Sequence, residues 1–220
     1  MAAIRLRSWL LLLVATVALT GVSCSRDLDR QHLERTTRAT YDQATGRLRE
    51  LTYDADKNGK IDTVTFLDGT KVIRTEIDSN EDGRVDRWEY FGPNGKLEKY
   101  GISRADNGTP DAWAYAGSDG ATERMEISLK HNDHIDRWEH YESGVIARAE
   151  EDANGDGRPD KWELYQTGTL VSVSFDNDGD GRPDRRLTYN HEGQLARIES
   201  DPDAAGTFRT QVDIPVAGGR

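Results

Sequence analysis

Short stretches of this chain alternate between apolar and polar residues, which is the pattern of a half-buried β-strand. Residues 87–90 place Trp88 and Tyr90 on one face of an extended segment, and Arg87 and Glu89 on the other. Such stretches come in pairs, and a polar residue followed by Gly separates the two members of each pair. Because Gly adopts the positive φ that tight hairpin turns need, each pair predicts a β-hairpin.

The hairpins belong to a repeat of 24 or 25 residues, and each copy begins with an acidic loop of nine residues. A strand follows the loop, then the turn dipeptide, then a second strand. Repetition at a period of this length is typical of a repeat architecture in which each unit packs against its neighbours. The copies begin at Asp54, Asp78, Ser103, Ser128, Asp152, Asp176 and Asp201.

The predicted fold is all-β, with tandem antiparallel hairpins that form an extended twisted meander or superhelix. The complete copies predict about twelve strands. Residues 41–53 resemble the back half of a copy, and residues 201–216 resemble the front half. If these ends pair with each other, the sheet closes into a barrel or a propeller-like ring; otherwise it stays open. The open form is our expectation and the closed form is the alternative.

The N-terminus has the pattern of an export signal. Arg5 and Arg7 precede an apolar run at residues 9–19, and small residues then lead to Cys24. The run of about eleven residues is shorter than the roughly 20 that a membrane span needs. The sequence therefore predicts a signal peptide at residues 1–23 that is removed on export.

The small residues before Cys24 resemble the lipobox of bacterial lipoproteins, in which the cysteine becomes the acylated first residue of the mature chain. The resemblance implies that Cys24 carries lipid such as palmitate, which anchors the chain to a membrane, and Ser25 after it favours the outer membrane. An ordinary secretory signal is the alternative. The expected organisation is a signal peptide at 1–23, lipidated cysteine and tether at 24–40, a β-hairpin repeat domain at 41–216 and a tail at 217–220.

Acidic residues outnumber basic residues by 40 to 29, which gives a formal net charge of −11. This excess argues against a nucleic-acid partner and favours cations. Cys24 is the only cysteine, so the exported domain contains no internal disulfide, and bound metal ions would be another means of stabilising it. A mean hydropathy of −0.79 predicts a thin core distributed along the repeats.

The acidic loop carries the candidate chemistry. In four copies, oxygen-bearing side chains occupy positions 1, 3, 5 and 9, and Gly occupies position 6. Two carboxylates about 4 Å apart repel by about 1 kcal/mol even in water, so several in one loop favour a divalent cation. The second and fifth copies match the calcium loop of helix–loop–helix proteins, including Glu at position 12. The flanks of the loops are strand-like, and Pro159 and Pro183 occupy position 8 of the fifth and sixth copies, so a helix–loop–helix hand is not expected.

The four loops also resemble the D-x-D-x-D-G-x-x-D calcium loops of thrombospondin type 3 repeats and of integrin-type propeller blades. The resemblance implies side-chain ligands at positions 1, 3, 5 and 9 and a main-chain carbonyl ligand at position 7, with about four calcium ions per chain. Whether Glu89 and Glu163 at position 12 are ligands or solvated side chains is left open. Alternatively the loops are only turns, which Asp, Asn and Gly favour. The expected metal ligands are Asp54, Asp56, Asn58, Lys60, Asp62, Asp78, Asn80, Asp82, Arg84, Asp86, Glu89, Asp152, Asn154, Asp156, Arg158, Asp160, Glu163, Asp176, Asp178, Asp180, Arg182 and Asp184.

Other clusters have weaker support. The third and fourth loops lack most of the acidic positions, and the seventh has Ala205 and Arg209 at positions 5 and 9. His131, His134 and His140 near Asp133 and Asp136 could suggest a transition-metal site, but solvated substitutions are the favoured interpretation. A Trp recurs at position 11 of the repeat, and evenly spaced Trp residues on one strand face more often form the core than a glycan-binding surface. These residues are Trp88, Trp113, Trp138 and Trp162.

The expected function is that of a calcium-binding envelope lipoprotein, with a structural or adhesive role in which calcium rigidifies the β-repeat domain. The expected partners are the membrane, through the lipid anchor, and an envelope protein or glycan. A glycan- or protein-binding module that uses the Trp and Tyr face is the first alternative, and an envelope hydrolase is the second. No nucleophile elbow, zinc-protease motif or phosphate-binding glycine loop is present in the sequence, so no catalytic residues are expected.

Overall fold

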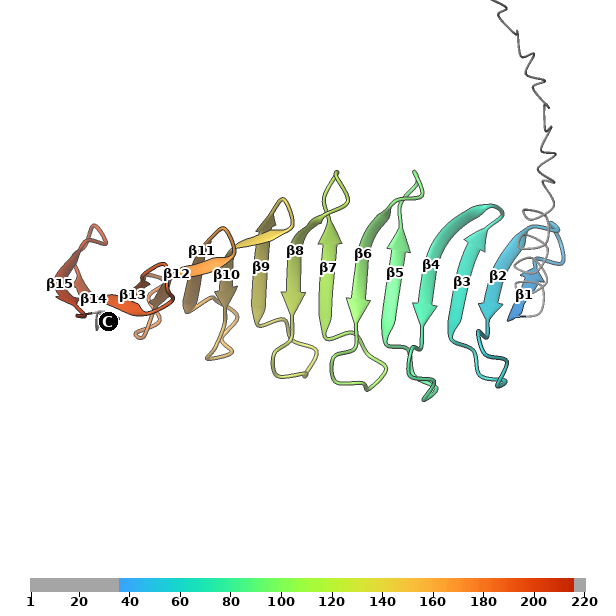
Figure 1. Ribbon diagram of the computed structural model, residues 1–220, viewed down its shortest axis with the longest axis horizontal. Helices are drawn as coiled ribbons and strands as arrows, with labels where there is room; N and C mark the ends of the chain where they lie inside the picture. The colour runs from blue at the N-terminus through green and yellow to red at the C-terminus, as the bar shows by residue number, and fades with distance from the viewer. Residues whose placement is uncertain (1–35, 216–220) are drawn as a thin grey trace, which may run out of the picture.

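The computed structural model describes residues 36–215 and consists of one antiparallel sheet of 15 strands (Figure 1). The strands lie in the sheet in the same order as in the sequence. This confirms the predicted all-β meander of linked hairpins. The strands are β1 (Thr37–Tyr41), β2 (Leu48–Tyr53), β3 (Thr63–Asp68), β4 (Lys71–Ile77), β5 (Arg87–Phe91), β6 (Leu97–Ile102), β7 (Ala112–Ala116), β8 (Thr122–Ile127), β9 (Arg137–Glu142), β10 (Val145–Glu151), β11 (Lys161–Gln166), β12 (Thr169–Phe175), β13 (Arg185–Tyr189), β14 (Leu195–Pro202) and β15 (Phe208–Asp213).

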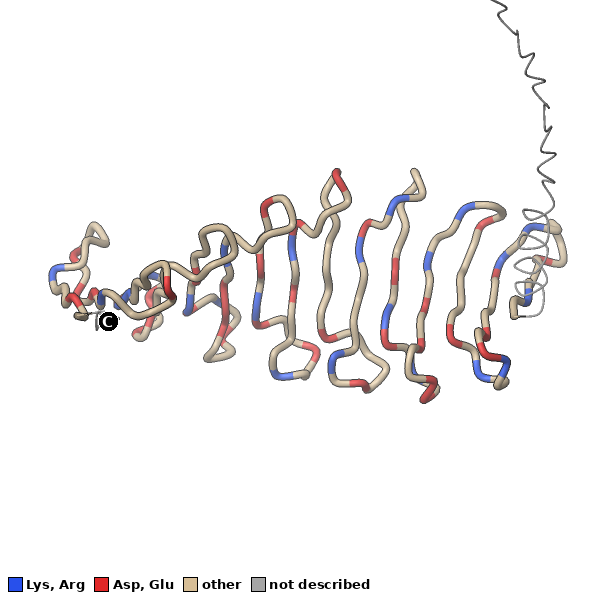
Figure 2. The backbone as a smooth tube through the Cα atoms, in the orientation of Figure 1, with Lys and Arg blue, Asp and Glu red and all other residues tan. Residues whose placement is uncertain are grey.

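Two kinds of connection alternate along the sheet. Tight turns join the two strands of each hairpin at one edge, and the acidic loops join consecutive hairpins at the opposite edge, drawn at the bottom of Figure 1. Asp and Glu recur in the loops along that lower edge (Figure 2). At the tight turns Ser143 and Gly144 both have positive φ, at 51° and 77°, as the predicted hairpin turns require. The meander therefore places the acidic loops side by side.

The sheet is open, with β1 and β15 at its two ends (Figure 1). Neighbouring strands run in opposite directions, so the first and fifteenth strands run in the same direction. Closing the sheet would need one parallel pair, which a meander of hairpins does not otherwise contain, and the closed barrel or ring is not formed. The sheet has more strands than the predicted twelve because β1, β2 and β15 extend the array at its ends. β1 begins at Thr37, inside the segment expected to be a tether.

The two faces of the sheet differ in how well they cover their side chains. The most buried apolar side chains include Ala112, Ala114, Ile127, Ala149 and Val173, each at most 8% exposed. The strand register places all five on the face opposite the tryptophans. Trp88, Trp113, Trp138 and Trp162 are only half-buried, so the prediction that they form the core was wrong. A single-layer sheet has no second layer to cover large rings, and only small side chains between larger neighbours become fully buried.

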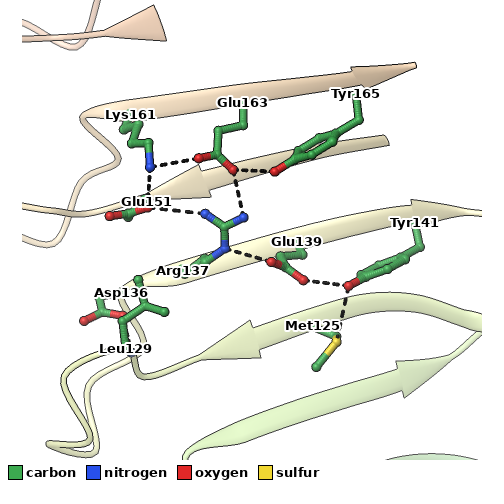
Figure 3. Close-up of polar contacts among 10 residues, drawn as sticks. All are labelled: Met125, Leu129, Asp136, Arg137, Glu139, Tyr141, Glu151, Lys161, Glu163 and Tyr165. Carbon is green, nitrogen blue, oxygen red and sulfur yellow. Dashed lines mark hydrogen bonds and ion pairs between the residues drawn. The ribbon is translucent and has the colours of Figure 1, made fainter. Parts of the chain in front are cut away.

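A network of charged side chains lies on the same face as the buried alanines (Figure 3). The guanidinium of Arg137 on β9 pairs with Glu139 at 2.7 Å, Glu163 at 2.8 Å and Glu151 at 3.3 Å. Lys161 adds ion pairs to Glu151 at 3.0 Å and to Glu163 at 2.8 Å. The network therefore connects β9, β10 and β11 through side chains, in a region that lacks large buried apolar groups.

The pKa of Glu163 reflects these partners. Burial by itself would raise the pKa, but hydrogen bonds from Arg137, Lys161 and Tyr165 outweigh it and lower the pKa to about 2. The Tyr165 hydroxyl donates to the carboxylate at 2.7 Å. Only 10% of the Glu163 side chain is exposed. The folded state thus holds this carboxylate ionised far below the ordinary pKa of glutamate.

Protonating Glu163 is expected to destabilise the sheet in acid. Because its pKa is lower in the folded state, its contribution is fully present above the ordinary value of 4.5 and is lost as the pH falls toward 2. After allowance for solvent screening, we expect the free energy of unfolding to fall by about 2 kcal/mol. Urea unfolding at several pH values between 5 and 2 measures it. Between pH 5 and 2, Glu163→Gln should lose about 2 kcal/mol less stability than the unmodified protein. The exposed control Glu142→Gln should lose as much as the unmodified protein. Equal losses in all three proteins would contradict a lowered pKa for Glu163.

Candidate metal-binding loops

The four acidic loops share one hydrogen-bonding scheme at their first position. The Asp carboxylate at position 1 accepts a hydrogen bond from the backbone N–H of Gly at position 6, which draws the loop into a closed turn. The position-6 glycines have φ between 87° and 92°, so Gly is required there. The bonds run from Gly59 to Asp54 at 3.1 Å, Gly83 to Asp78 at 2.9 Å, Gly157 to Asp152 at 2.8 Å and Gly181 to Asp176 at 2.7 Å.

Positions 3 and 5 form two successive Asx turns. The side-chain oxygen at position 3 accepts from the N–H at position 5, and the side-chain oxygen at position 5 accepts from the N–H at position 7. In the sixth loop these bonds run from Asp180 to Asp178 at 3.1 Å and from Arg182 to Asp180 at 2.8 Å. The same pairs occur at Asp56, Asn58 and Lys60, at Asn80, Asp82 and Arg84, and at Asn154, Asp156 and Arg158.

The Asp at position 9 shapes the loop in every complete copy, including the two that lack a ligand set. Its carboxylate accepts a hydrogen bond from the backbone N–H at position 2. Asp111 and Asp136, in the third and fourth loops, make this bond and are 3% and 5% exposed. The sequence shows Asp at position 9 in all six complete copies, but the calcium-loop pattern assigned it only as a ligand. The other four residues are Asp62, Asp86, Asp160 and Asp184.

The sixth loop brings three carboxylates together. Asp176, Asp178 and Asp184 each offer an oxygen, and these oxygens lie within 4.8 Å of one another. A backbone hydrogen bond from Asp180 lowers the pKa of Asp178, but burial and the charges of Asp184, Asp180 and Asp176 outweigh it and raise the pKa. The repulsion shows that negative charge accumulates in this loop. This Asp triad could hold a metal ion.

In the first, second and fifth loops an Asn replaces one of the acids, at position 5 or 3. Within residues 36–215, no other group of three acidic or His side chains converges as closely as the triad of the sixth loop. At position 1 the first two loops differ from the fifth and sixth. Oδ1 of Asp54 and Oδ1 of Asp78 are buried and have no hydrogen-bond partner. A buried carboxylate oxygen without a partner is costly, and a cation would relieve that cost.

The two glutamates at position 12 lie on the sheet rather than in the loops. Glu89 on β5 pairs with Arg87 at 2.7 Å, and Glu163 on β11 belongs to the network around Arg137. Both carboxylates thus already have cationic partners from the strands. Neither is freely solvated, since their side chains are 22% and 10% exposed.

The basic residues at position 7 reach across to the following loop. Lys60 Nζ donates to the carbonyl of Glu81 at 2.6 Å, and Arg84 donates to the carbonyl of Asp106 at 3.0 Å. Arg182 donates to the carbonyl of Ala204 at 3.5 Å. Their side chains therefore connect neighbouring loops, while the expected role of their own carbonyls, and that of Arg158, as metal ligands stays a prediction.

The histidines do not form a shared site. His131 Nδ1 lies 2.5 Å from Asp111 of the preceding loop, and His140 lies in β9 on the Trp-bearing face. Burial, and then the charge of Arg148, lower the pKa of His140. His134 is exposed, and its backbone N–H donates to Asn132. The three histidines therefore do not converge, and of the three only His134 fits the expectation of a solvated side chain.

Aromatic and basic side chains alternate on the Trp-bearing face. The ammonium of Lys99 lies 4.6 Å from the ring centre of Trp113 and 5.1 Å from that of Tyr90. The guanidinium of Arg124 lies 4.1 Å from the ring centre of Tyr115. Such cation–π contacts give these three rings an additional partner on a face that no second layer covers.

The fold defines a single-layer β-hairpin repeat protein, and comparison with known proteins adds no family name. No protein-family model and no curated protein match the sequence. Among solved structures, TarM is 14% identical with a TM-score of 0.35, over 51% of this chain and 23% of TarM. Accessory secretory protein 1, 2 and 3 of Streptococcus pneumoniae is 16% identical with a TM-score of 0.34, over 55% of this chain and 19% of that structure. The chain thus spans less than a quarter of these proteins.

Among residues 36–215 there is no helix that is long and apolar enough to span a membrane. The expected signal peptide, Cys24 and most of the expected tether lie outside these residues.

Proposed function

We propose that the acidic loops bind calcium, and that this protein is an exported, lipid-anchored envelope protein with a structural or adhesive role. The convergence of Asp176, Asp178 and Asp184 within 4.8 Å is the observation that carries the proposal. Hard oxygen ligands on a flexible loop suit calcium better than softer metals. The shared scheme of turns supports the same role for the first, second and fifth loops.

Calcium would act by joining hairpins. Each loop connects the second strand of one hairpin to the first strand of the next, as Asp176–Asp184 does between β12 and β13. An ion held by both ends of the loop would restrain the angle between the two hairpins. A single-layer sheet with few buried apolar residues and no disulfide has little else to restrain it, so binding would couple to folding.

The anchor and the location are also part of the proposal. A lipid on Cys24 would hold the array at a bacterial membrane, at the outer membrane or the cell surface, with an envelope protein or glycan as partner. The role proposed is not enzymatic. The acidic excess of the chain, with a net charge of −11, supports a preference for cations over nucleic acid.

Isothermal titration calorimetry of the purified protein with calcium tests the proposal. We expect binding of about four ions per chain, with dissociation constants of about 10⁻⁴ to 10⁻³ M, as in other extracellular calcium modules. A titration with magnesium at the same concentration serves as the comparison, because magnesium is smaller and demands more regular geometry. If the protein binds no calcium, the proposed function is wrong.

The Trp-bearing face is the second candidate, as a docking surface for a glycan or protein. The observation that favours it is a shallow groove of about 570 Å³ whose lining includes Trp162, Leu164 and Thr188. Leu164 is 53% exposed, and large exposed apolar groups beside an aromatic ring are typical of binding surfaces. If the loops bind no calcium, this face becomes the leading functional candidate.

A further inference from the structure

The first two acidic loops each receive a carboxylate from the loop that follows. Glu81 is at position 4 of the second loop, and its Oε2 accepts a hydrogen bond from Asn58 Nδ2 in the first loop. Asp106 is at position 4 of the third loop, and its two carboxylate oxygens accept from Asn80 Nδ2 in the second loop at 3.1 and 3.3 Å. In each loop, this carboxylate contacts the position at which Asn stands instead of Asp, which is Asn58 in the first loop and Asn80 in the second.

The main chain holds these two residues in place. The carbonyls of Glu81 and Asp106 accept from the side chains of Lys60 and Arg84, which come from the receiving loops. Position 4 has positive φ, at 57° in Glu81 and 52° in Asp106. The side chain at this position is thereby directed toward the preceding loop rather than into its own.

The amide of Asn58 lies between two carboxylates, since its Nδ2 also donates to Asp56 at 3.1 Å. Carboxylates of two neighbouring loops, Asp56 and Glu81, therefore meet at the Asn58 amide.

A separate observation also distinguishes these two loops from the fifth and sixth. The Oδ1 atoms of Asp54 and Asp78 are buried and have no hydrogen-bond partner. In the fifth and sixth loops the equivalent oxygens accept from Gly155 at 2.6 Å and Gly179 at 2.8 Å. In the first two loops, Lys57 and Glu81 occupy the position of these glycines, and no donor forms a hydrogen bond with the Asp Oδ1 atom.

We propose that the cation sites of the first two loops are shared between neighbouring loops, with Glu81 as a ligand of the first site and Asp106 as a ligand of the second. The inference rests on the proposed calcium function and adds two ligands that the repeat pattern does not assign. It also gives the third loop, which lacks a site of its own, a role as the donor of Asp106. The fifth and sixth loops are self-contained, because Gly179 and Ala204 occupy the corresponding position.

Sharing links the sites mechanically. An ion in the first site would restrain the second loop through Glu81, and an ion in the second site would restrain the third loop through Asp106. Binding along this part of the array should therefore be cooperative, because an ordered second loop presents its own ligands in place. The calcium-loaded edge would stiffen from the first loop to the third.

Calcium titration by calorimetry tests the proposal, in a parent protein that carries Asp156→Ala and Asp180→Ala to remove the fifth and sixth sites. Glu81→Gln should weaken one of the two remaining sites by about 10- to 100-fold, and Asp106→Asn should weaken the other by a similar factor. Glu192→Gln is the matched control, since it removes the same charge from a hairpin turn at the far edge and should bind calcium like the parent.

Restoring calcium binding with a second substitution distinguishes a metal ligand from a residue that only supports the loop structure. Asn58→Asp should restore binding to the Glu81→Gln protein, and Asn80→Asp should restore it to Asp106→Asn, because each returns a carboxylate to the same site. If Glu81→Gln and Asp106→Asn titrate like the parent, the shared sites are disproved while calcium binding stands. If the parent binds no calcium but the unmodified protein does, the first two loops are not sites. If the unmodified protein binds none, the proposed function itself fails.

Discussion

Calcium is expected to raise the melting temperature of this protein by at least about 10 °C. Each site contributes about 2.7 kcal/mol when calcium is at one hundred times its dissociation constant. For a domain of this size 1 kcal/mol corresponds to about 2–4 °C, so two occupied sites already give such a shift. Thermal unfolding followed by circular dichroism, in calcium and in chelator, measures the difference.

The variant Asp156→Ala with Asp180→Ala should lose about half of the calcium-dependent shift, because it removes a ligand from two of four loops. These substitutions also remove hydrogen bonds to Arg158 and Arg182, so the variant should be less stable even in chelator. The decisive quantity is therefore the difference between calcium and chelator for each protein. Glu142→Ala with Glu192→Ala, two exposed acids at the hairpin edge, should keep the full shift. A shift of zero in the unmodified protein would mean that the loops are only turns.

Replacing Arg137 by Met is expected to destabilise the protein by about 3–5 kcal/mol. The guanidinium is 13% exposed and contacts Glu139, Glu151 and Glu163, whose side chains are between 10% and 19% exposed. Removing it leaves these carboxylates close together with only Lys161 as a cation. The expected fall in melting temperature is about 6–20 °C, and urea unfolding at pH 7 measures the free energy directly.

The control for Arg137 is an arginine in an exposed ion pair. Arg47 pairs with Asp68 at 3.0 Å, but the two side chains are 56% and 60% exposed. Arg47→Met should therefore change the stability by less than about 1 kcal/mol. Adding Glu163→Gln to Arg137→Met should recover part of the loss, because it removes one uncompensated charge. Equal effects of Arg137→Met and Arg47→Met would show that the network does not stabilise the sheet.

Local sequence signals were sufficient for the strands and turns. Alternation in residues such as Arg87 to Tyr90 and the polar-Gly dipeptides such as Ser143 and Gly144 act within a few residues, so they specify hairpins without reference to the rest of the chain. The same was true of the loop backbone, where Asp176 and Gly181 are only five positions apart. The number of strands was underestimated because β1 and β15 lie at the ends, where a half copy does not show whether it pairs.

The placement of side chains was less predictable. The repeat pattern suggested that the tryptophans form the core, but a sheet without a second layer buries small residues such as Ala114 instead. The sequence left open whether Glu163 is a calcium ligand or a solvated residue. In the structure it lies on the sheet and forms ion pairs with Arg137 and Lys161. Its partner Arg137 lies on another strand, 26 positions away in the sequence, and only the strand register brings them together.

The sequence by itself determined the repeat, its period, the hairpin in each copy and the acidic loop that closes on its own carboxylates, because all of these depend on interactions within one copy. The tertiary structure decided which face is buried, how Arg137 joins three strands, and how Glu81 and Asp106 reach the preceding loops. These features depend on contacts between copies. Such contacts are set by the sheet register and by the stacking of adjacent loops. A linear pattern of residue types specifies neither the register nor the stacking.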